Sequence, residues 1–333
     1  MADYININGN NIPIRASDPT NPIEGEVWYN LTTRALKGQG FQTGGWSSSN
    51  NMNYSMSDGG MSRQGGKSAA LAWQGAPAPV TGLNKTESYD GSTWTSESTT
   101  PYQASGVGSF GGATSAVGAG GQPGGGGVAT TIEWNGSAWG SGGSLPYANL
   151  YQFGGAGPGT DGILVGGYSQ PPPNQATNDV KVYDGSTWST DPATCPFAFY
   201  SGTHYGAGSS DCNVLGGYSS PPPAIQNNHA NYNGTAFTTL TVYPTVTGGS
   251  GAFGTTSNAY VFGGIPNLST GNTWDGSSWT TSTSYPAGTE YTYNSGATVN
   301  DGVSSGGTLS GSYTNNTFEY TAAGPVTKTI SSS

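Results

Sequence analysis

Two histidines and two cysteines are the side chains of this 333-residue chain best suited to metal binding or nucleophilic chemistry. Cys195, His204, Cys212 and His229 follow the pattern C-x8-H-x7-C-x16-H, which matches no standard zinc spacing. Two cysteines are too few to stabilise a chain of this length by disulfides, so we expect free thiols, with one Cys195–Cys212 bridge as the alternative. We therefore expect all four side chains to have isolated polar or core roles, with no metal and no cofactor.

Paired carboxylates would be the other route to catalysis, because glycoside hydrolysis uses two acidic side chains that flank the scissile bond. Asp90, Asp184 and Asp275 instead each precede a glycine in a turn-like stretch. The glycine-rich run 120–127 lacks the Lys-Ser/Thr that completes a phosphate-binding loop. We expect no catalytic residue and a non-enzymatic protein, with a sugar-active enzyme as the minor alternative.

The charge and composition exclude several classes of protein. The net charge is −10 with only eight Lys and Arg, too few to neutralise a nucleic acid backbone. No run approaches the roughly 18 apolar residues of a membrane span, so we expect no membrane insertion. The 57 glycines favour turns, while the 11% aromatic content provides the apolar surface that a disordered chain lacks. An all-β protein is the expected class.

An internal repeat organises most of the chain. The hexapeptide YDGSTW at 89–94 recurs unchanged at 183–188, and related forms start at 134, 232 and 274. Their glycines stand at 91, 136, 185, 234 and 276, giving spacings of 45, 49, 49 and 42 residues. A second marker, a glycine pair after a short apolar run, keeps step with the first and begins at 120, 166, 216, 263 and 306. With Trp73-Gln74-Gly75 as a divergent first copy, six repeats result.

Asp-Gly between aromatic and hydroxyl residues predicts a two-residue hairpin with a type I′ turn. That turn would place Tyr89 opposite Ser92 and make Tyr89 and Trp94 a diagonal pair on one face. Each repeat then carries an aromatic face that it can bury only against its neighbours.

A repeat of about 45 residues with two hairpins predicts one four-stranded propeller blade. For the second repeat we expect strands near 104–110, 115–118, 129–134 and 137–140. A parallel β-helix is the rival architecture, but its rungs are about half this length. The stretch 40–49 is expected to be a fourth strand that completes the last blade beside 317–321, removing an exposed edge. The expected domains are an attachment segment 1–39, a six-bladed propeller 40–326 and a tail 327–333.

The leader GEVWYN at 25–30, the aromatic DGSTW repeats and the ending FEYT…TKTISSS together carry a resemblance that covers essentially the whole chain. The chain resembles the kelch-like virion structural or tail-fibre proteins of bacteriophages, marine phages in particular. The resemblance implies a kelch-like β-propeller of four-stranded antiparallel blades, assembled in the host cytoplasm and present in several copies on the tail or capsid of the particle.

Two partner surfaces are expected. The leader, with Val27, Trp28 and Tyr29, is the candidate attachment to other virion proteins. The loops GGYSQPPPNQ and GGYSSPPPAI are the candidate contact with host-surface glycan or protein, because stiff loops lose little entropy on binding. Their candidate residues are Tyr168, Pro171, Pro172, Pro173, Tyr218, Pro221, Pro222 and Pro223. These loops could instead pack on one another. The alternative function is a lectin-like adhesion module.

Overall fold

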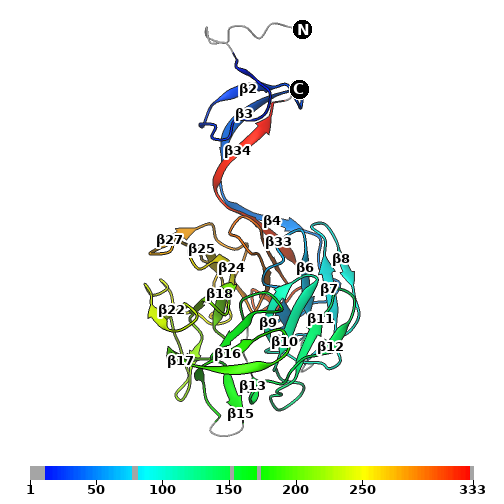
Figure 1. Cartoon of the computed structure of the whole chain (residues 1–333), viewed down its shortest axis with the longest axis vertical. Helices are drawn as coiled ribbons and strands as arrows, with labels where there is room; N and C mark the ends of the chain where they lie inside the picture. The colour runs from blue at the N-terminus through cyan, green and yellow to red at the C-terminus, as the bar shows by residue number, and fades with distance from the viewer. Residues whose placement is uncertain (1–11, 77–81, 151–153, 171–173, 331–333) are drawn as a thin grey trace. The chain divides into compact units, whose positions relative to one another are not determined.

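The computed structural model describes residues 12–76, 82–150, 154–170 and 174–330, and within these ranges the chain forms β-strands and no helix. No helix in the described residues could therefore cross a membrane. Contacts divide the chain into a small unit, Met1–Gly45 with Ala322–Ser333, and a large unit, Trp46–Thr321. Figure 1 shows both units.

The small unit is one four-stranded sheet made from both ends of the chain. Its strand order is β1 (Ile14–Arg15), β2 (Val27–Asn30), β3 (Ala35–Gln42) and β34 (Gly324–Thr329). Strands β1 and β2 are parallel, and the other pairs are antiparallel. The β3–β34 ladder runs from Lys37 opposite Thr329 to Gln42 opposite Gly324. Because this ladder holds 40–42 and 324–329 together, the units divide at 45/46 and 321/322, not at the expected 39/40 and 326/327.

The large unit contains six principal sheets. The first has β5 (Gly60–Met61), β6 (Ala70–Trp73), β7 (Thr86–Tyr89) and β8 (Trp94–Ser96); the second has β9 (Gly108–Gly112), β10 (Ser115–Ala119), β11 (Thr131–Trp134) and β12 (Trp139–Ser141). The third has β14 (Gly162–Val165), β16 (Thr177–Tyr183) and β17 (Trp188–Phe199). The fourth has β18 (Thr203–Gly208), β19 (Asp211–Leu215), β22 (His229–Tyr232) and β23 (Phe237–Thr239); the fifth has β24 (Gly251–Thr255), β25 (Asn258–Phe262), β26 (Gly271–Trp274) and β27 (Trp279–Ser282).

The sixth sheet joins the two ends of the large unit. Its order is β29 (Tyr293–Ser295), β30 (Gly302–Ser305), β33 (Thr317–Thr321) and β4 (Gly45–Ser49). The expected pairing of an N-terminal strand with 317–321 is confirmed for 45–49, whereas 40–42 belong to β3 in the small unit. Shorter strands lie in the loops: β13 (Ala148–Leu150) with β15 (Tyr168–Gln170), β20 (Tyr218–Ser219) with β21 (Ala224–Ile225), and β28 (Thr289–Glu290) with β31 (Thr308–Leu309) and β32 (Ser312–Tyr313).

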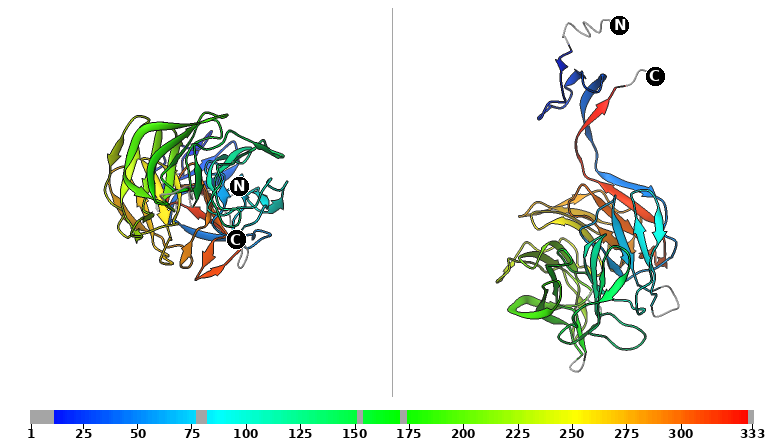
Figure 2. Two further views of the ribbon diagram at one scale, coloured as in Figure 1. Left: turned by 90° about the horizontal axis from the view of Figure 1, so that it is seen from below. Right: turned by 45° about the vertical axis from the view of Figure 1, so that its right-hand side comes forward.

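The fold is thus all-β and propeller-like, with the sheets of the large unit placed around a common centre (Figure 2, left). The four strands expected in the second repeat are confirmed to within a few residues by β9 to β12.

The hairpin of each repeat differs from the expected two-residue turn. Tyr89 lies directly opposite Trp94, so the loop has four residues and the two rings form a direct cross-strand pair. Only Gly91 in this loop has a positive φ, whereas a type I′ turn needs two such residues. The Asp90 carboxylate explains the wider loop, because it accepts bonds from the backbone N–H groups of Ser92 and Thr93. These bonds, with those from the two hydroxyl groups, lower the pKa of Asp90 to about 2. The same side-chain cap recurs at Asn135, Asp184, Asn233 and Asp275.

The tryptophans of the fourth strands lie between neighbouring sheets. Trp139 donates its indole N–H to Thr86 Oγ1 of the preceding sheet at 2.9 Å, and Trp188 donates to Thr131 Oγ1 at 2.8 Å. Trp94 donates to Thr317 Oγ1 of the sixth sheet at 2.8 Å. The bonds of Trp279 to Thr241 O and of Trp46 to Tyr260 Oη repeat the arrangement in the fifth and sixth sheets. Burial between sheets and a satisfied N–H together fix each ring, as the aromatic repeat predicts.

The glycine pairs link every sheet to the next. The first residue of each pair donates its N–H to the strand that leads into the hairpin of its own repeat, or to the residue before that strand. The second donates to the segment that leads into the first strand of the next repeat, which for Gly167 is Phe199 at the end of β17. The second bonds run Gly75 to Ala104, Gly121 to Asn149, Gly167 to Phe199, Gly217 to Thr247, Gly264 to Thr289 and Gly307 to Met56, at 2.7 to 3.0 Å. Both residues of each pair have positive φ, and Gln74 adopts this backbone at 56° in the first repeat. The divergent copy Trp73-Gln74-Gly75 is therefore structurally equivalent to the others.

We predict that Gly264→Ala destabilises the large unit by roughly 2–4 kcal/mol, because a Cβ would force a left-handed backbone and approach Thr247 Oγ1 closely. Gly112→Ala is the matched control, since a Cβ on Gly112 in β9 meets no atom within 4 Å. Urea unfolding of both variants checks the prediction. Equal midpoints for the two variants would contradict the role assigned to the second glycine.

Candidate functional site

The two loop tyrosines that the sequence singles out lie in one aromatic cluster. Tyr200 joins them: its ring stacks on Tyr218 with centroids 5.3 Å apart, and Tyr168 meets its edge at 5.2 Å. The backbones of Tyr200 and Tyr218 also exchange two hydrogen bonds, at 2.9 and 3.0 Å. All three side chains are half-buried. The tyrosine cluster, Tyr168, Tyr200 and Tyr218, thus combines mutual packing with an exposed aromatic surface.

Only one of the two proline triplets beside the cluster lies in the described residues. Pro221, Pro222 and Pro223 are exposed in the turn between β20 and β21. Pro171, Pro172 and Pro173 lie outside the described residues. Tyr200 was missed by the sequence reasoning because it belongs to neither repeat marker. Its only signal was its place just before the first strand of the fourth sheet.

A cleft of about 530 Å³ lies beside β15 in the third repeat. Its polar lining includes Tyr147, Gln170, Gln175, Asn178 and Asp179. Amide, hydroxyl and carboxylate groups beside an aromatic ring are the functional groups that hydrogen-bond and stack on a sugar. The cleft shares the GGYSQPPPNQ loop with the tyrosine cluster, because Tyr168 and Gln170 are both in β15.

A buried charge network forms one wall of this cleft. Tyr147 Oη donates to Asp179 Oδ2 at 2.5 Å, and Lys181 Nζ lies 3.1 Å from the same oxygen. Lys181 is fully buried and also donates to the carbonyl of Gly166 at 2.9 Å. Its ammonium sits 5.0 Å from the centroid of the Tyr147 ring. These contacts hold the Asp179 carboxylate at the cleft, and its Oδ1 is buried without a hydrogen-bond partner among the described residues.

The electrostatics of this wall determine the protonation of Asp179 and Tyr147. Burial alone would raise the pKa of Asp179, but the Lys181 ammonium and the hydrogen bonds outweigh it and hold the pKa below its usual value. Burial and the Asp179 charge raise the pKa of Tyr147. At neutral pH the cleft therefore presents an ionised acceptor and a protonated hydroxyl. Asp179 is the only acidic residue among the described residues that line it, so a carboxylate pair for glycoside hydrolysis is missing there.

A series of four backbone hydrogen bonds connects loops of the large unit and ends at Ser201, the residue after Tyr200. Gly249 N–H donates to Ser201 O, Tyr291 N–H to Gly249 O, Asp58 N–H to Tyr291 O, and Gly106 N–H to Asp58 O. All five residues have positive φ. Asp58 Oδ1 is buried with no partner among the described residues, and this burial raises the pKa of Asp58 to about 7.

The reactive side chains identified from the sequence lie in the core. Cys195 and Cys212 are free thiols in one apolar cluster, as expected, and burial raises the pKa of Cys195 to about 12. His204 and His229 are buried, and burial lowers the pKa of each to about 4. Across the described residues no three His, Cys, Asp or Glu side chains group in a way that would hold a metal ion.

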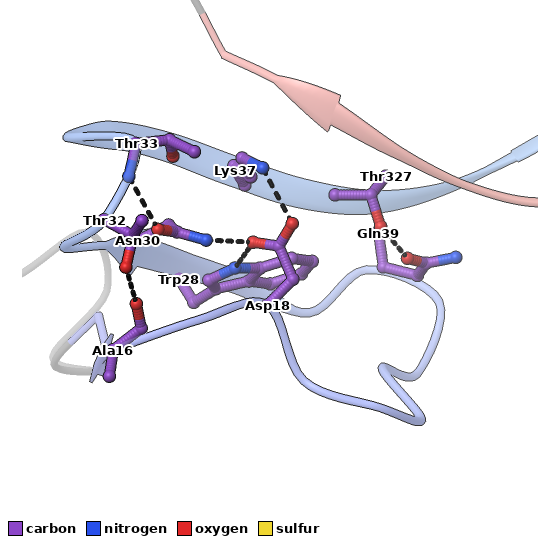
Figure 3. A network of polar contacts seen from close by, with 9 residues as sticks. All are labelled: Ala16, Asp18, Trp28, Asn30, Thr32, Thr33, Lys37, Gln39 and Thr327. Carbon is purple, nitrogen blue, oxygen red and sulfur yellow. Dashed lines mark hydrogen bonds and ion pairs between the residues drawn. The ribbon is translucent and has the colours of Figure 1, made fainter.

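The candidate attachment residues have an interior role. Trp28 is fully buried in the small unit, where its indole N–H donates to Asp18 Oδ1 at 2.9 Å. Asn30 and Lys37 donate to the same carboxylate, as Figure 3 shows, and the three donors lower the pKa of Asp18 to about 2. Val27 and Tyr29 are half-buried. The large apolar side chains that the small unit exposes are others: Ile14 (69%), Ile23 (73%), Leu31 (54%), Phe41 (56%) and Ile330 (46%).

Comparison with known proteins finds no family model and no curated protein that matches the chain.

We predict that Asp58→Asn stabilises the chain above about pH 7 and changes little at pH 4. An acid whose pKa is raised on folding makes its full contribution to the stability of the protein only at a pH below the pKa that the acid has in the unfolded chain. This contribution is lost as the pH rises from 3.8 towards 7, and the difference corresponds to at most roughly 4 kcal/mol. Asn tolerates the left-handed backbone at this position. Urea unfolding at pH 4 and pH 8 measures the effect, and a variant that is less stable than the wild type at pH 8 would show that the charge of Asp58 is satisfied.

Proposed function

We propose that the chain is a non-enzymatic structural protein of a phage particle, with a six-bladed kelch-like propeller carried on the tail or capsid by its small unit. The phage assignment comes from the resemblance of the leader, the repeats and the chain ending. The observation that carries the structural role is the small unit itself, a sheet that combines early and late segments of the chain and whose described residues include five exposed large apolar side chains.

The cycle of contacts between sheets supports six blades in a closed ring. Innermost strands are in contact in the order β5 with β9, β9 with β14, β18 with β24, β24 with β29, and β29 with β5, while β17 contacts β22 and β23. The bond from Gly307 to Met56 returns the glycine-pair links to the first sheet. A ring leaves few exposed sheet edges, which suits a protein displayed in many copies.

The exposed apolar residues of the small unit support attachment to other virion proteins. The side chains of Ile14, Ile23 and Phe41 are each more than half exposed. Single exposed apolar side chains are common on folded proteins, but their exposed surface contributes nothing to the stability of the small unit. Contact with another protein would remove this surface from water and stabilise the complex. We therefore assign attachment to these side chains and not to Trp28.

We predict that Ile14→Ser, Ile23→Ser and Phe41→Ser, introduced together into the genome that encodes the chain, lower its copy number per purified particle by about tenfold or more. Val242→Ser with Val246→Ser, which removes exposed apolar side chains from the large unit, is the matched control. Quantitative mass spectrometry of particles gives the copy number, and thermal unfolding shows that both variants fold. If the unaltered chain is missing from particles, the structural role is wrong.

A second function, glycan binding, is favoured by the cleft in the third repeat. Tyr147, Gln175 and Asn178 offer one aromatic face and several hydrogen-bonding groups, and the tyrosine cluster extends this surface. Binding of host-surface sugar is compatible with a role on the particle, since a receptor-binding fibre has both properties.

We predict that the purified chain binds a subset of neutral glycans on an array, and that Gln175→Ala with Asn178→Ala reduces the signal by about tenfold because it removes two hydrogen-bonding side chains. Tyr168→Ala with Tyr218→Ala tests the tyrosine cluster separately. Asn231→Ala, in the fourth sheet and away from the lining residues, is the control. If the purified chain binds no glycan, the glycan-binding function is wrong and the structural role alone is retained.

A further inference from the structure

A second cavity of about 190 Å³ lies at the centre of the large unit and shares no lining residue with the cleft. Its lining comes from five of the six principal sheets, at or near the ends of the innermost strands. Thr255, Ala207 and Ala297 are exposed residues of this lining, so the cavity communicates with solvent. Tyr205 and Phe253 contribute apolar walls.

Two polar side chains of the cavity lining, His204 and Arg63, approach the same glycine, Gly154, which precedes the lining residue Gly155. A Cβ built on Gly154 would lie 3.0 Å from Nδ1 of His204 and 3.5 Å from Nη2 of Arg63. Gly154 has a φ of +114°, a backbone that side-chain-bearing residues rarely adopt. The absence of a side chain at this position leaves the imidazole and the guanidinium facing the same small volume.

His204 has one ring nitrogen available for a ligand. Its Nε2 lies 3.0 Å from the carbonyl oxygen of Val165 and 3.3 Å from the backbone nitrogen of the same residue, so Nε2 donates in one tautomer and accepts in the other. Its Nδ1 is buried and has no hydrogen-bond partner among the described residues, although the side chain is only 1% exposed. A buried polar atom without a partner costs free energy unless a bound group satisfies it. In the tautomer with Nε2–H, Nδ1 accepts a hydrogen bond.

The charge of the cavity is positive. Arg63 is its one charged lining residue, and none of the described residues that line it is acidic. Burial lowers the pKa of Arg63 to about 10, which leaves the guanidinium protonated at neutral pH. A guanidinium in an apolar surrounding binds carboxylate and phosphate oxygens more strongly than it would in water.

We propose that the central cavity binds a small hydroxylated oxyanion, with the carboxylate or phosphate group on Arg63 and a hydroxyl donating to Nδ1 of His204. The size of the cavity suits one monosaccharide-sized group, with Phe253 and Tyr205 against its apolar face. A uronic acid has this combination of carboxylate, hydroxyl and apolar ring face. Inorganic phosphate has the same oxyanion chemistry from a different source.

Isothermal titration calorimetry of the full chain in Tris chloride at pH 7.5, with D-glucuronate, D-glucose and inorganic phosphate as separate probes, tests the proposal. We expect glucuronate to bind at least about tenfold more tightly than glucose, because only glucuronate carries the charge that Arg63 recognises. Arg63→Gln should abolish the difference between the two sugars. Since this variant replaces a buried residue, its unfolding curve is measured alongside.

Ala297→Glu is a second variant that tests the charge of the cavity without altering a buried residue, because Ala297 is exposed at the cavity lining. The added carboxylate should weaken glucuronate binding by about threefold to tenfold, while Ala297→Gln should leave it unchanged. Tighter binding of phosphate than of glucuronate would support an oxyanion site and assign it to free phosphate. Equal binding of glucose and glucuronate, or no binding of any probe up to about 50 mM, would overturn the proposal.

Discussion

The large unit depends on one repeated interaction, the pair of left-handed residues that follows the second strand of each sheet. The first residue bonds within its own sheet and the second bonds to the next, so each pair fixes the position of a sheet relative to its neighbour. An L-residue with a side chain disfavours this backbone, which explains the glycines. Gln74 shows that a side chain is tolerated at the first position, whereas glycine stands at the second position in all six repeats. Glycine therefore occurs where two backbones approach closely, and aromatic residues occur where two sheets face each other.

The aromatic pairs then provide the buried surface between sheets that the glycine links align. Each tryptophan of a fourth strand lies beside its partner on the same sheet and donates its indole N–H to an oxygen of the sheet before it. The indole thus supplies apolar area and a directional bond at the same contact. Phe237 occupies this position in the fourth sheet and has no N–H to donate, and there the ring serves packing alone.

Much of the fold follows from the sequence because the repeat signals are local. The strands of the second repeat and the closure by Gly45–Ser49 could be predicted, since hairpins, glycine pairs and aromatic spacing are readable within a few residues. The predicted register of the hairpin was wrong because the Asp90 carboxylate caps backbone N–H groups in a wider loop. An Asp before a glycine is compatible with this cap as well as with a type I′ turn. The β3–β34 ladder was missed since it pairs residues about 290 positions apart and neither strand belongs to the repeat. For the candidate sites, the sequence singled out Tyr168 and Tyr218 as loop residues, and their role stays a prediction. Tyr200 between them, Asp179 beside the cleft and Arg63 in the second cavity depend on tertiary proximity that spacing does not encode.

The order in which the sixth sheet is completed has a consequence for synthesis. Strand β4 is among the first parts of the large unit to leave the ribosome, yet its sheet partner β33 begins only at Thr317. Until Thr317–Thr321 have been synthesised, Trp46 has no Tyr320 to pack against and the edge of β4 stays open. A prematurely terminated chain would keep that edge and that indole exposed, which marks it for chaperones or proteases.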